Sequence, residues 1–583
     1  MKLALALRCL TALAVLPLVA PALPATAAPL ADGTLCHRVY LPLTLGGGGG
    51  VPAPAPQPFA AECQGFPDFN GDGYADLVIG VPNKEVHNGI SLQTDVGLVH
   101  VIYGSPNGLD AGAGQTGPDD QIWHRAVGGV SAAPGDAYGQ AVAAGDFNGD
   151  HYDDLAIGIP GANIDSQDNA GAVQIIWGAA NGLSTVGIQE WSRASDNVLG
   201  TPAAGDAFGT ALAAGDFNGD GHADLAIGAP YAEVNGDVQA GAVHILFGYG
   251  SGLVGGGSEL LTQDTPGFVA SPAELGDEFG YALAAGDFNN DGVADLAVGT
   301  PFEDNGASYS DAGAVQVFFG QGTGPDRGLL VFGSVVGPQH WTADSDDDVE
   351  GVMEANDRFG YALAAGDFDD DGYADLAVGI PHENHGSGGG TIVYGGAVNI
   401  LPGSAAGLAA TPAKPARLWH QDVTNVADEV EANELFGHAL AAGDFDGDGF
   451  ADLAVGVPGE QTFDLAIGAV HLLYGGDNGV TANYDTLLYD PDNPEAGDLF
   501  GRALMAGDFD GNGRVDLAVG ATRDDPIGVT ADNSGSVFAF YSDATGLQLN
   551  LNQNWYAGHV GLKGAPADDD EFGSALPSSP DRP

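Results

Sequence analysis

Carboxylate and amide side chains gather in a ten-residue stretch that is best seen in DFNGDGHADL, residues 216–225. Oxygen-bearing side chains occupy its first, third, fifth and ninth positions, which are Asp216, Asn218, Asp220 and Asp224. So dense a set of oxygen donors suits a hard cation, and a shell of about six to eight oxygens at variable angles suits Ca²⁺ more than Mg²⁺. The seventh position, here His222, varies freely between copies, as expected of a residue that offers only its backbone carbonyl.

The stretch occurs seven times, at intervals of 64 to 80 residues. The chain is therefore predicted to hold up to seven Ca²⁺ ions. The predicted ligands, in the order of the first, third, fifth, seventh and ninth positions, are Asp68, Asn70, Asp72, Tyr74 and Asp76; Asp146, Asn148, Asp150, Tyr152 and Asp154; Asp216, Asn218, Asp220, His222 and Asp224; Asp287, Asn289, Asp291, Val293 and Asp295; Asp367, Asp369, Asp371, Tyr373 and Asp375; Asp444, Asp446, Asp448, Phe450 and Asp452; and Asp508, Asp510, Asn512, Arg514 and Asp516.

Two other interpretations of the loop were weighed. An EF-hand shares the first half of the motif but needs a Glu at the twelfth position and an exiting helix. The twelfth residue here is Ile or Val in every copy, for example Ile227. A hairpin rich in Asp, Asn and Gly that binds no metal is the second alternative, but converging carboxylates repel one another strongly without a cation. The stretch is predicted to be a calcium-binding turn between two strands.

The seven loops are expected to differ in their affinity for Ca²⁺. Five of them, those beginning at Asp68, Asp216, Asp287, Asp367 and Asp444, keep every side-chain ligand and a Gly at the sixth position. The second loop has His151 in place of that Gly, which is costly if the backbone there is left-handed. The seventh loop has Asn512 in place of an Asp and so carries one charge fewer. The second and seventh loops are predicted to bind Ca²⁺ most weakly.

Short apolar segments flank each loop and must position it. In the third copy, FGTALAAGDF leads into the loop, DLAIGAP leaves it, and GAVHILFG follows a polar stretch. Short apolar runs bounded by glycines and turn residues predict strands. Four strands in each of seven repeats suit an all-β fold, a seven-bladed β-propeller of four-stranded blades over residues 61–583.

The chain ends suggest how such a ring is closed. DDDEFGSAL at 568–576 repeats the segment that precedes each later loop, and no such segment stands before Asp68. We expect a C-terminal strand at residues 572–576 to join the N-terminal blade, because this closes the ring and removes both exposed edges. An unpaired eighth repeat is the alternative.

Composition restricts the partners. The chain has 79 acidic and 15 basic residues, a formal net charge of -64, so nucleic acid and anionic lipid would be repelled. Residues 1–27 are predicted to be a secretory signal peptide, and no later stretch reaches the roughly 18 apolar residues of a membrane span. Residues 28–60 are predicted to be a flexible Gly- and Pro-rich linker. Cys36 and Cys63 flank its LGGGGGVPAPAPQP segment, and a disulfide between them is predicted, two free thiols being the alternative.

FGTAL, the acidic loop and GAP at 228–230 recur in fixed order, and together they resemble the FG-GAP repeat of integrin α-chain propellers and of secreted bacterial proteins. The resemblance covers roughly residues 61–583. It implies a seven-bladed propeller with hairpin-bound Ca²⁺ and a role in adhesion or extracellular ligand binding. The inserted adhesion domain with a DxSxS motif is not found in the sequence, so a complete integrin receptor is not expected. Similar repeats accompany the catalytic domain of a glycosylphosphatidylinositol-cleaving phospholipase, and no segment here is expected to form that domain.

Three classes of function stay open. The first is a secreted, monomeric, non-catalytic module that binds an extracellular protein or glycan, the second an extracellular hydrolase or lyase on the propeller scaffold, and the third a structural surface component. GAGQTG at 112–117 lacks the strand-to-helix context of a dinucleotide site. His382 and His385 in PHENHG are interpreted as solvated loop residues, with transition-metal ligands as the alternative. No GxSxG or HExxH motif is present. The first class is therefore predicted.

Strand order indicates where a ligand would bind. In an up-and-down blade the connections between strands 1 and 2 share one face, whereas the connections between strands 2 and 3 share the other. The acidic loops belong to the first face, so the variable stretches after GAP lie on the second, where loops of differing length suit ligand contact. Tyr231, Phe302 and Tyr309 are the predicted anchors, and neutral drift of exposed loops is the alternative.

Overall fold

The computed structural model describes residues 66–577, apart from 88–91, 112–117, 266–271, 323–327, 330–336, 344–352, 388–389, 412–413, 463–464, 493, 527, 530 and 560–561. The predicted signal peptide, the linker, the Cys36–Cys63 disulfide and the GAGQTG segment lie outside the described residues.

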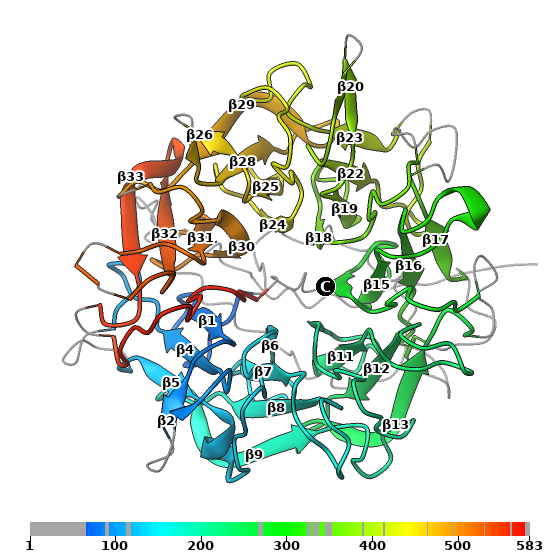
Figure 1. Ribbon diagram of the computed structural model, residues 1–583, viewed down its shortest axis with the longest axis vertical. Helices are drawn as coiled ribbons and strands as arrows, with labels where there is room; N and C mark the ends of the chain where they lie inside the picture. The colour runs from blue at the N-terminus through cyan, green and yellow to red at the C-terminus, as the bar shows by residue number, and fades with distance from the viewer. Residues whose placement is uncertain are drawn as a thin grey trace, which may run out of the picture. The chain divides into compact units, whose positions relative to one another are not determined.

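Seven antiparallel sheets surround a central axis as the blades of a propeller (Figure 1). The first two blades are β1 (Leu77–Val81), β4 (Leu98–Ile102) and β5 (Gln121–Trp123); and β6 (Val142–Gly145), β7 (Asp154–Ile159), β8 (Ala172–Trp177) and β9 (Ser184–Trp191). The third and fourth are β10 (Leu212–Gly215), β11 (Asp224–Ala229), β12 (Ala242–Phe247) and β13 (Val254–Leu261); and β14 (Ala282–Gly286), β15 (Asp295–Thr300), β16 (Ala314–Phe318) and β17 (Gln339–Trp341).

The fifth and sixth blades are β18 (Leu363–Gly366), β19 (Asp375–Ile380), β22 (Ala397–Leu401) and β23 (Arg417–Trp419); and β24 (Ala439–Gly443), β25 (Asp452–Val457), β28 (Ala469–Tyr474) and β29 (Thr481–Leu488). The seventh is β30 (Phe500–Gly507), β31 (Asp516–Ala521), β32 (Ser536–Asp543) and β33 (Gly546–Trp555). Small hairpins extend three blades: β2 (Val86–His87) with β3 (Leu92–Gln93), β20 (His385–Ser387) with β21 (Gly390–Ile392), and β26 (Gln461–Thr462) with β27 (Leu465–Ala466). Two 3₁₀ turns, η1 (Arg125–Gly128) and η2 (Gly306–Ser308), are the helical elements of the described chain.

Side-chain size explains the radial order of the strands. The first strand of a blade carries small, buried side chains, as in β10 with the sequence LAAG. Figure 1 shows the first strands nearest the centre of the ring. The third strands carry larger apolar residues, which pack between blades: Val173 and Ile175 of β8 share one core cluster with Leu225 and Ile227 of β11. The predicted all-β, seven-bladed fold is confirmed.

The glycines of FG and GAP allow neighbouring blades to approach closely. A Cβ added to Gly228 of the GAP segment would lie 2.2 Å from the carbonyl oxygen of Gly280, which belongs to the FG of the next blade. Any side chain at Gly228 would therefore force the two blades apart. This contact explains why the two short motifs recur together in the sequence.

The chain ends meet in the first blade. Residue Ala575 forms an isolated antiparallel bridge with Gly80 of β1, and the Gly80 amide donates to the Ala575 carbonyl at 2.8 Å. Figure 1 shows this C-terminal segment, in red, beside β1. The pairing is a single bridge and not a full strand. Packing also holds the segment, because Phe572 is fully buried and its ring lies 5.2 Å from that of His100.

Candidate functional site

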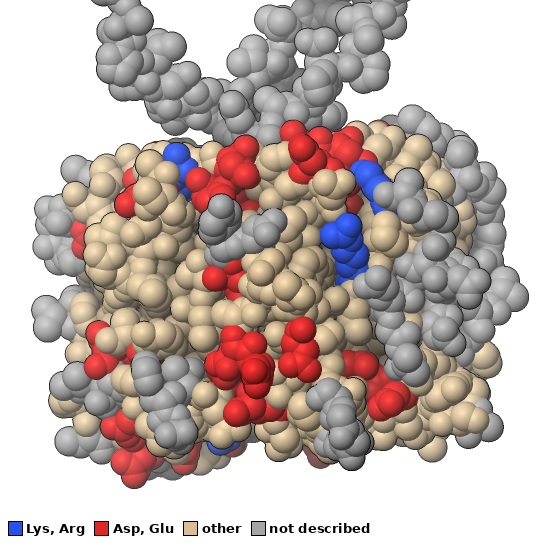
Figure 2. Space-filling view, turned by 90° about the horizontal axis from the view of Figure 1, so that it is seen from above, with Lys and Arg blue, Asp and Glu red and all other residues tan. Residues whose placement is uncertain are grey.

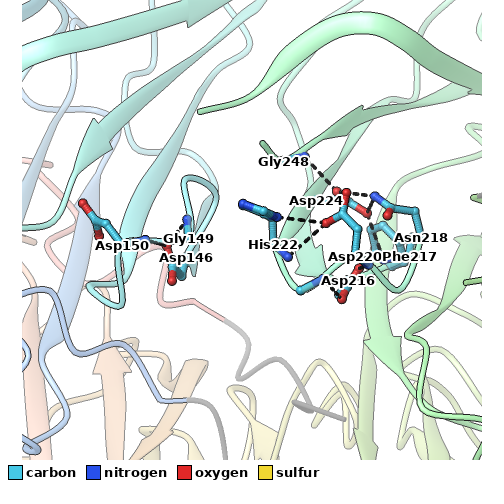
Figure 3. Close-up of polar contacts among 11 residues, drawn as sticks. Asp146, Gly149, Asp150, Asp216, Phe217, Asn218, Asp220, His222, Asp224 and Gly248 are labelled. Carbon is cyan, nitrogen blue, oxygen red and sulfur yellow. Dashed lines mark hydrogen bonds and ion pairs between the residues drawn. The ribbon is translucent and has the colours of Figure 1, made fainter. Parts of the chain in front are cut away.

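Each acidic loop connects the first two strands of its blade. In the third blade Gly215 pairs with Asp224 at the base of the hairpin. Asp224 is fully buried. Its carboxylate accepts the amide of Phe217 at 3.0 Å, the amide of Gly248 at 2.7 Å and the side-chain amide of Asn218 (Figure 3). Asp224 thus ties the loop to the end of the third strand.

All seven loops repeat this arrangement. The second-position Phe is fully buried in every copy, and its amide donates to the ninth-position Asp. The same Asp accepts an amide at or just after the end of the third strand, from Gly104, Gly178, Gly248, Gly320, Gly403, Gly475 and Ser542 in turn. The ninth Asp therefore has a structural role that is separate from any ion.

Other oxygens of the third loop are also fixed in place or left without a donor. Asp216 accepts the amides of Asp220 at 3.0 Å and Gly221 at 2.7 Å, which wraps the chain around its carboxylate. Asn218 is 5 % exposed, and its Oδ1 has no hydrogen-bond donor within the described structure. A buried carbonyl oxygen without a donor is a suitable ligand for Ca²⁺. The residues of the loop therefore fit the predicted ion.

The electrostatics of the loops also favour a bound cation. Three carboxylate oxygens lie within 4.8 Å of one another in each of the loops that begin at Asp367, Asp444 and Asp508. Burial, and secondarily the neighbouring carboxylates, raises the pKa of Asp154, Asp452 and Asp516 to about 8. A bound cation would stabilise the ionised forms that these surroundings disfavour. Figure 2, which views the blades from the side, shows acidic side chains in several patches of the surface and few basic ones.

Neighbouring loops are joined to one another. The eighth-position amide of each loop donates to the first-position carbonyl of the preceding loop, as Ala223 does to Asp146 at 3.0 Å. Seven such bonds, of 2.9 to 3.2 Å, form a closed ring that ends with Ala75 and Asp508. We call them the loop ring.

The seventh-position side chains also span adjacent loops. Figure 3 shows His222 between the second and third loops, and a Cβ added to Gly149 would lie 2.7 Å from His222 Nε2. Arg514 likewise extends to the sixth loop, where it donates to the carbonyl of Asp446 at 2.6 Å. The sequence predicted that this position offers only its backbone carbonyl, so these side-chain contacts were missed.

The second loop carries backbone strain. His151 has φ 74°, where Gly221 of the third loop has φ 90°. Because left-handed backbone is costly for residues other than Gly, His151→Gly is expected to stabilise the protein by up to about 1 kcal/mol. The reverse change, Gly221→His, should destabilise it. Urea unfolding in the presence of a chelator measures both, and a stabilising Gly221→His would contradict the argument.

The fifth loop has an internal competitor for its ion. Lys414 Nζ lies 2.5 Å from Asp369 Oδ2 and also contacts Asp371 Oδ2, two predicted ligands. Lys414→Ala is therefore expected to raise the calcium affinity of this loop, by about two- to tenfold for the loss of two partly exposed ion pairs. Calcium titration followed at the Gly372 amide measures the change. Lys563→Ala, whose lysine pairs with Asp119 and Asp120, is the control and should leave the affinity unchanged.

A second group of residues lies at the other end of the first strands. The aromatic arc consists of Tyr281, Phe302, Tyr361 and His438. Ring centroids are 5.2 Å apart for Tyr281 and Tyr361, 5.2 Å for Tyr361 and His438, and 5.8 Å for Tyr281 and Phe302. Arg358 lies over the Phe302 ring at 4.8 Å. Since β14 begins just after Tyr281 and ends just before Asp287, the arc and the loops are on opposite faces.

The structure brings only part of the predicted ligand anchors together. Phe302 belongs to the aromatic arc. Tyr231 is half-buried and interacts electrostatically with Tyr281 and Tyr361 of the arc, whereas Tyr309, 41 % exposed, directly follows η2. Tyr281, Tyr361 and His438 lie outside the variable stretches and were not predicted. The sequence held a signal for them, because the residue after FG is aromatic in three consecutive copies.

The interpretation of His382 and His385 as solvated was wrong. Both are half-buried, because their rings pack on different neighbours. His382 lies 4.4 Å from Tyr394, and His385 lies 4.5 Å from His420 and contacts the Gly396 carbonyl at 2.8 Å. Burial lowers the pKa of His382 to about 4.

The fold and the loops define a seven-bladed β-propeller whose first hairpins carry acidic loops. The FG-GAP repeat is matched at residues 65–102, 138–176, 208–246, 279–318, 359–395, 436–473 and 500–540. The chain therefore belongs to the FG-GAP repeat family and is an integrin α-like propeller.

Individual relatives match only parts of the chain. Integrin alpha-PS5 of Drosophila melanogaster is 35% identical over 194 residues, which are 33% of this chain and 16% of the relative. Phosphatidylinositol-glycan-specific phospholipase D of Homo sapiens is 31% identical over 225 residues, 39% of this chain and 24% of the relative. Among solved structures, a rhamnogalacturonan lyase of Bacillus licheniformis has a TM-score of 0.31 at 10% identity, over 87% of this chain and 93% of its own. Within the described residues, no helix has the length and apolar character needed to span a membrane.

Proposed function

We propose that the protein is a secreted, calcium-binding propeller that acts as a non-catalytic module for adhesion or ligand binding. Its ligand is an extracellular protein or glycan, and the similarity to integrin α-chains favours a protein. The aromatic arc is the observation that carries the proposal. Half-buried aromatic rings beside a guanidinium offer stacking and cation–π contacts, which anchor ligands at interfaces.

The acidic loops have a different task in this proposal. They lie at the opposite ends of the first strands, so the ions they hold would stiffen the hairpins and would not touch the ligand. Asp216, Asn218, Asp220 and Asp224, with the carbonyl of His222, would hold the ion of the third blade. Calcium therefore supports recognition indirectly, by keeping the blades in place.

Binding to extracellular matrix proteins and to a glycan array, with calcium and with a chelator, tests the proposal. The double variant Tyr281→Ala with Tyr361→Ala should lose binding of whichever ligand the intact protein retains. Tyr249→Ala is the matched control, because Tyr249 is 62% exposed and stacks on His222 of the third loop. Binding that survives in the double variant would contradict the assigned face, and turnover of the ligand would replace the module by an enzyme.

A further inference from the structure

A buried carboxylate marks every crossing, the segment that joins the fourth strand of one blade to the first strand of the next. These residues are Asp136, Asp206, Asp277, Asp357, Glu434, Asp498 and Asp570, none more than 3% exposed. Each stands two residues before the aromatic residue of the FG motif, on the face opposite the acidic loops. Each also accepts the amide of the residue three positions earlier, at 2.5 to 2.8 Å. The backbone geometry is the same in all seven crossings.

Three crossings neutralise this carboxylate with a basic side chain. Arg125 pairs with Asp136 at 3.2 Å, Arg193 with Asp206 at 2.5 Å, and Lys84 with Asp570. Arg125 and Arg193 each stand two residues after the Trp that ends the fourth strand. The crossing into the third blade, with Arg193 and Asp206, is thus a complete example of a charge-paired crossing.

The crossing into the seventh blade has the opposite composition. The residue two positions after the end of β29 is Asp490, where the second and third blades have arginine. Asp490, Asp498 and Asp524 are 1%, 3% and 3% exposed, and their carboxylate oxygens lie within 4.8 Å of one another. Asp524 Oδ2 accepts the hydroxyl of Ser536, and Asp490 Oδ1 accepts the amide of Asp492 at 2.8 Å. Three buried carboxylates therefore meet where the third blade places one carboxylate and one guanidinium.

The surroundings of the three aspartates add further negative charge. The titratable and charged groups around them are Asp492, Glu495, Asp525 and Arg523. Arg523 donates its amide to the carbonyl of Asp498, but its half-exposed guanidinium contacts Glu571 at 3.4 Å. Like charges at this separation in a buried site cannot all stay ionised at low cost, so the site favours bound protons.

We propose that the crossing into the seventh blade is a pH-dependent latch, which is closed while Asp490, Asp498 and Asp524 share protons and opens locally as they ionise. The ordinary pKa of an Asp is 3.8, and burial, with a smaller contribution from the neighbouring carboxylates, raises the pKa of Asp498 and that of Asp524 to about 7, although the Glu495 amide and the Ser536 hydroxyl each act to lower it. A carboxyl group whose pKa is raised in the closed form stabilises that form fully at pH values below its ordinary pKa. That stabilisation is lost as the pH rises from about 4 to about 7, and it is absent above about 7.

Hydrogen exchange in the full chain, loaded with calcium, tests the latch. The amide of Glu495 is bonded to Asp498, and the amide of Ala203 is bonded to Asp206 in the charge-paired third blade. The exchange rates are first corrected for the pH dependence of intrinsic amide exchange, which gives the equilibrium constant of local opening. This opening constant at Glu495 should rise about tenfold per pH unit between pH 5 and 7 for each proton released, and then level off. The constant at Ala203 should stay flat, because a guanidinium remains charged throughout this range.

Asp490→Arg recreates the arrangement of Arg193 and Asp206 and should flatten the response at Glu495. If the arginine variant does not fold, Asp490→Asn is the alternative. This smaller change removes one carboxylate and should reduce the slope of the opening constant at Glu495 against pH. Equal slopes at Glu495 and Ala203 would overturn the proposal. So would protection at pH 8 that is present in calcium, is lost in a chelator, and behaves in the same way in Asp508→Asn, because a metal ion would then take the place of the protons.

Discussion

Asp224→Ala is expected to destabilise the protein by about 3–5 kcal/mol, both with calcium and in its absence. The reason is that Asp224 is fully buried and accepts the amides of Phe217 and Gly248, at 3.0 and 2.7 Å. Truncation leaves these two amides and the side-chain amide of Asn218 without a partner. Urea unfolding with calcium and with a chelator measures the change.

Asp220→Ala is the matched control in the same loop. The Asp220 side chain is 26% exposed, and it accepts only local contacts from His222. This variant should weaken calcium binding but cost less than about 1 kcal/mol in the chelator. If both variants unfolded at the same urea concentration without calcium, the structural role given to the ninth position would be wrong.

Removal of calcium should have the second large effect. A ligand present at 100 times its dissociation constant stabilises by about 2.7 kcal/mol per site, so the five loops with complete ligands together contribute on the order of 10 kcal/mol. Scanning calorimetry in calcium and in a chelator should show a much lower thermal midpoint in the chelator.

Salt is a necessary control for this experiment. The chain carries a formal net charge of -64, so any added electrolyte stabilises it by screening self-repulsion. Magnesium chloride and sodium chloride at matched ionic strength separate screening from specific binding. Equal midpoints in calcium and in matched magnesium would show that the loops do not hold calcium specifically.

The architecture could be predicted from the sequence because each blade repeats the same local signals. FG, the acidic loop and GAP occur in fixed order, and Gly228 and Gly280 show the physical reason, since their close contact sets the distance between blades. The hairpin position of the loop followed from the apolar residues at its twelfth position. Each of these features is determined within a short stretch of chain, so a single repeat is enough to predict it.

Contacts between repeats were harder to predict. Lys414 lies 43 residues after Asp371 in sequence, and nothing near it suggests that it contacts an acidic loop. The side chain of His222 contacts the preceding loop, which no inspection of a single repeat can reveal. The crossing carboxylates were also missed, because only three of them have a basic partner and these partners come from two different parts of the repeat, after the fourth strand for Arg125 and Arg193 and after GVP for Lys84.

The loop ring is one of two circumferential sets of backbone bonds. On the loop face, blades cannot move apart radially unless bonds such as that of Ala223 to Asp146 break, and the bond of Ala75 to Asp508 links the first blade to the seventh. On the opposite face, the amide of the aromatic residue of each FG motif donates to a carbonyl of the preceding blade, as Phe208 does to Ala170 at 3.1 Å. Both faces therefore resist radial expansion, and together the two sets of bonds keep the blades at a fixed circumference.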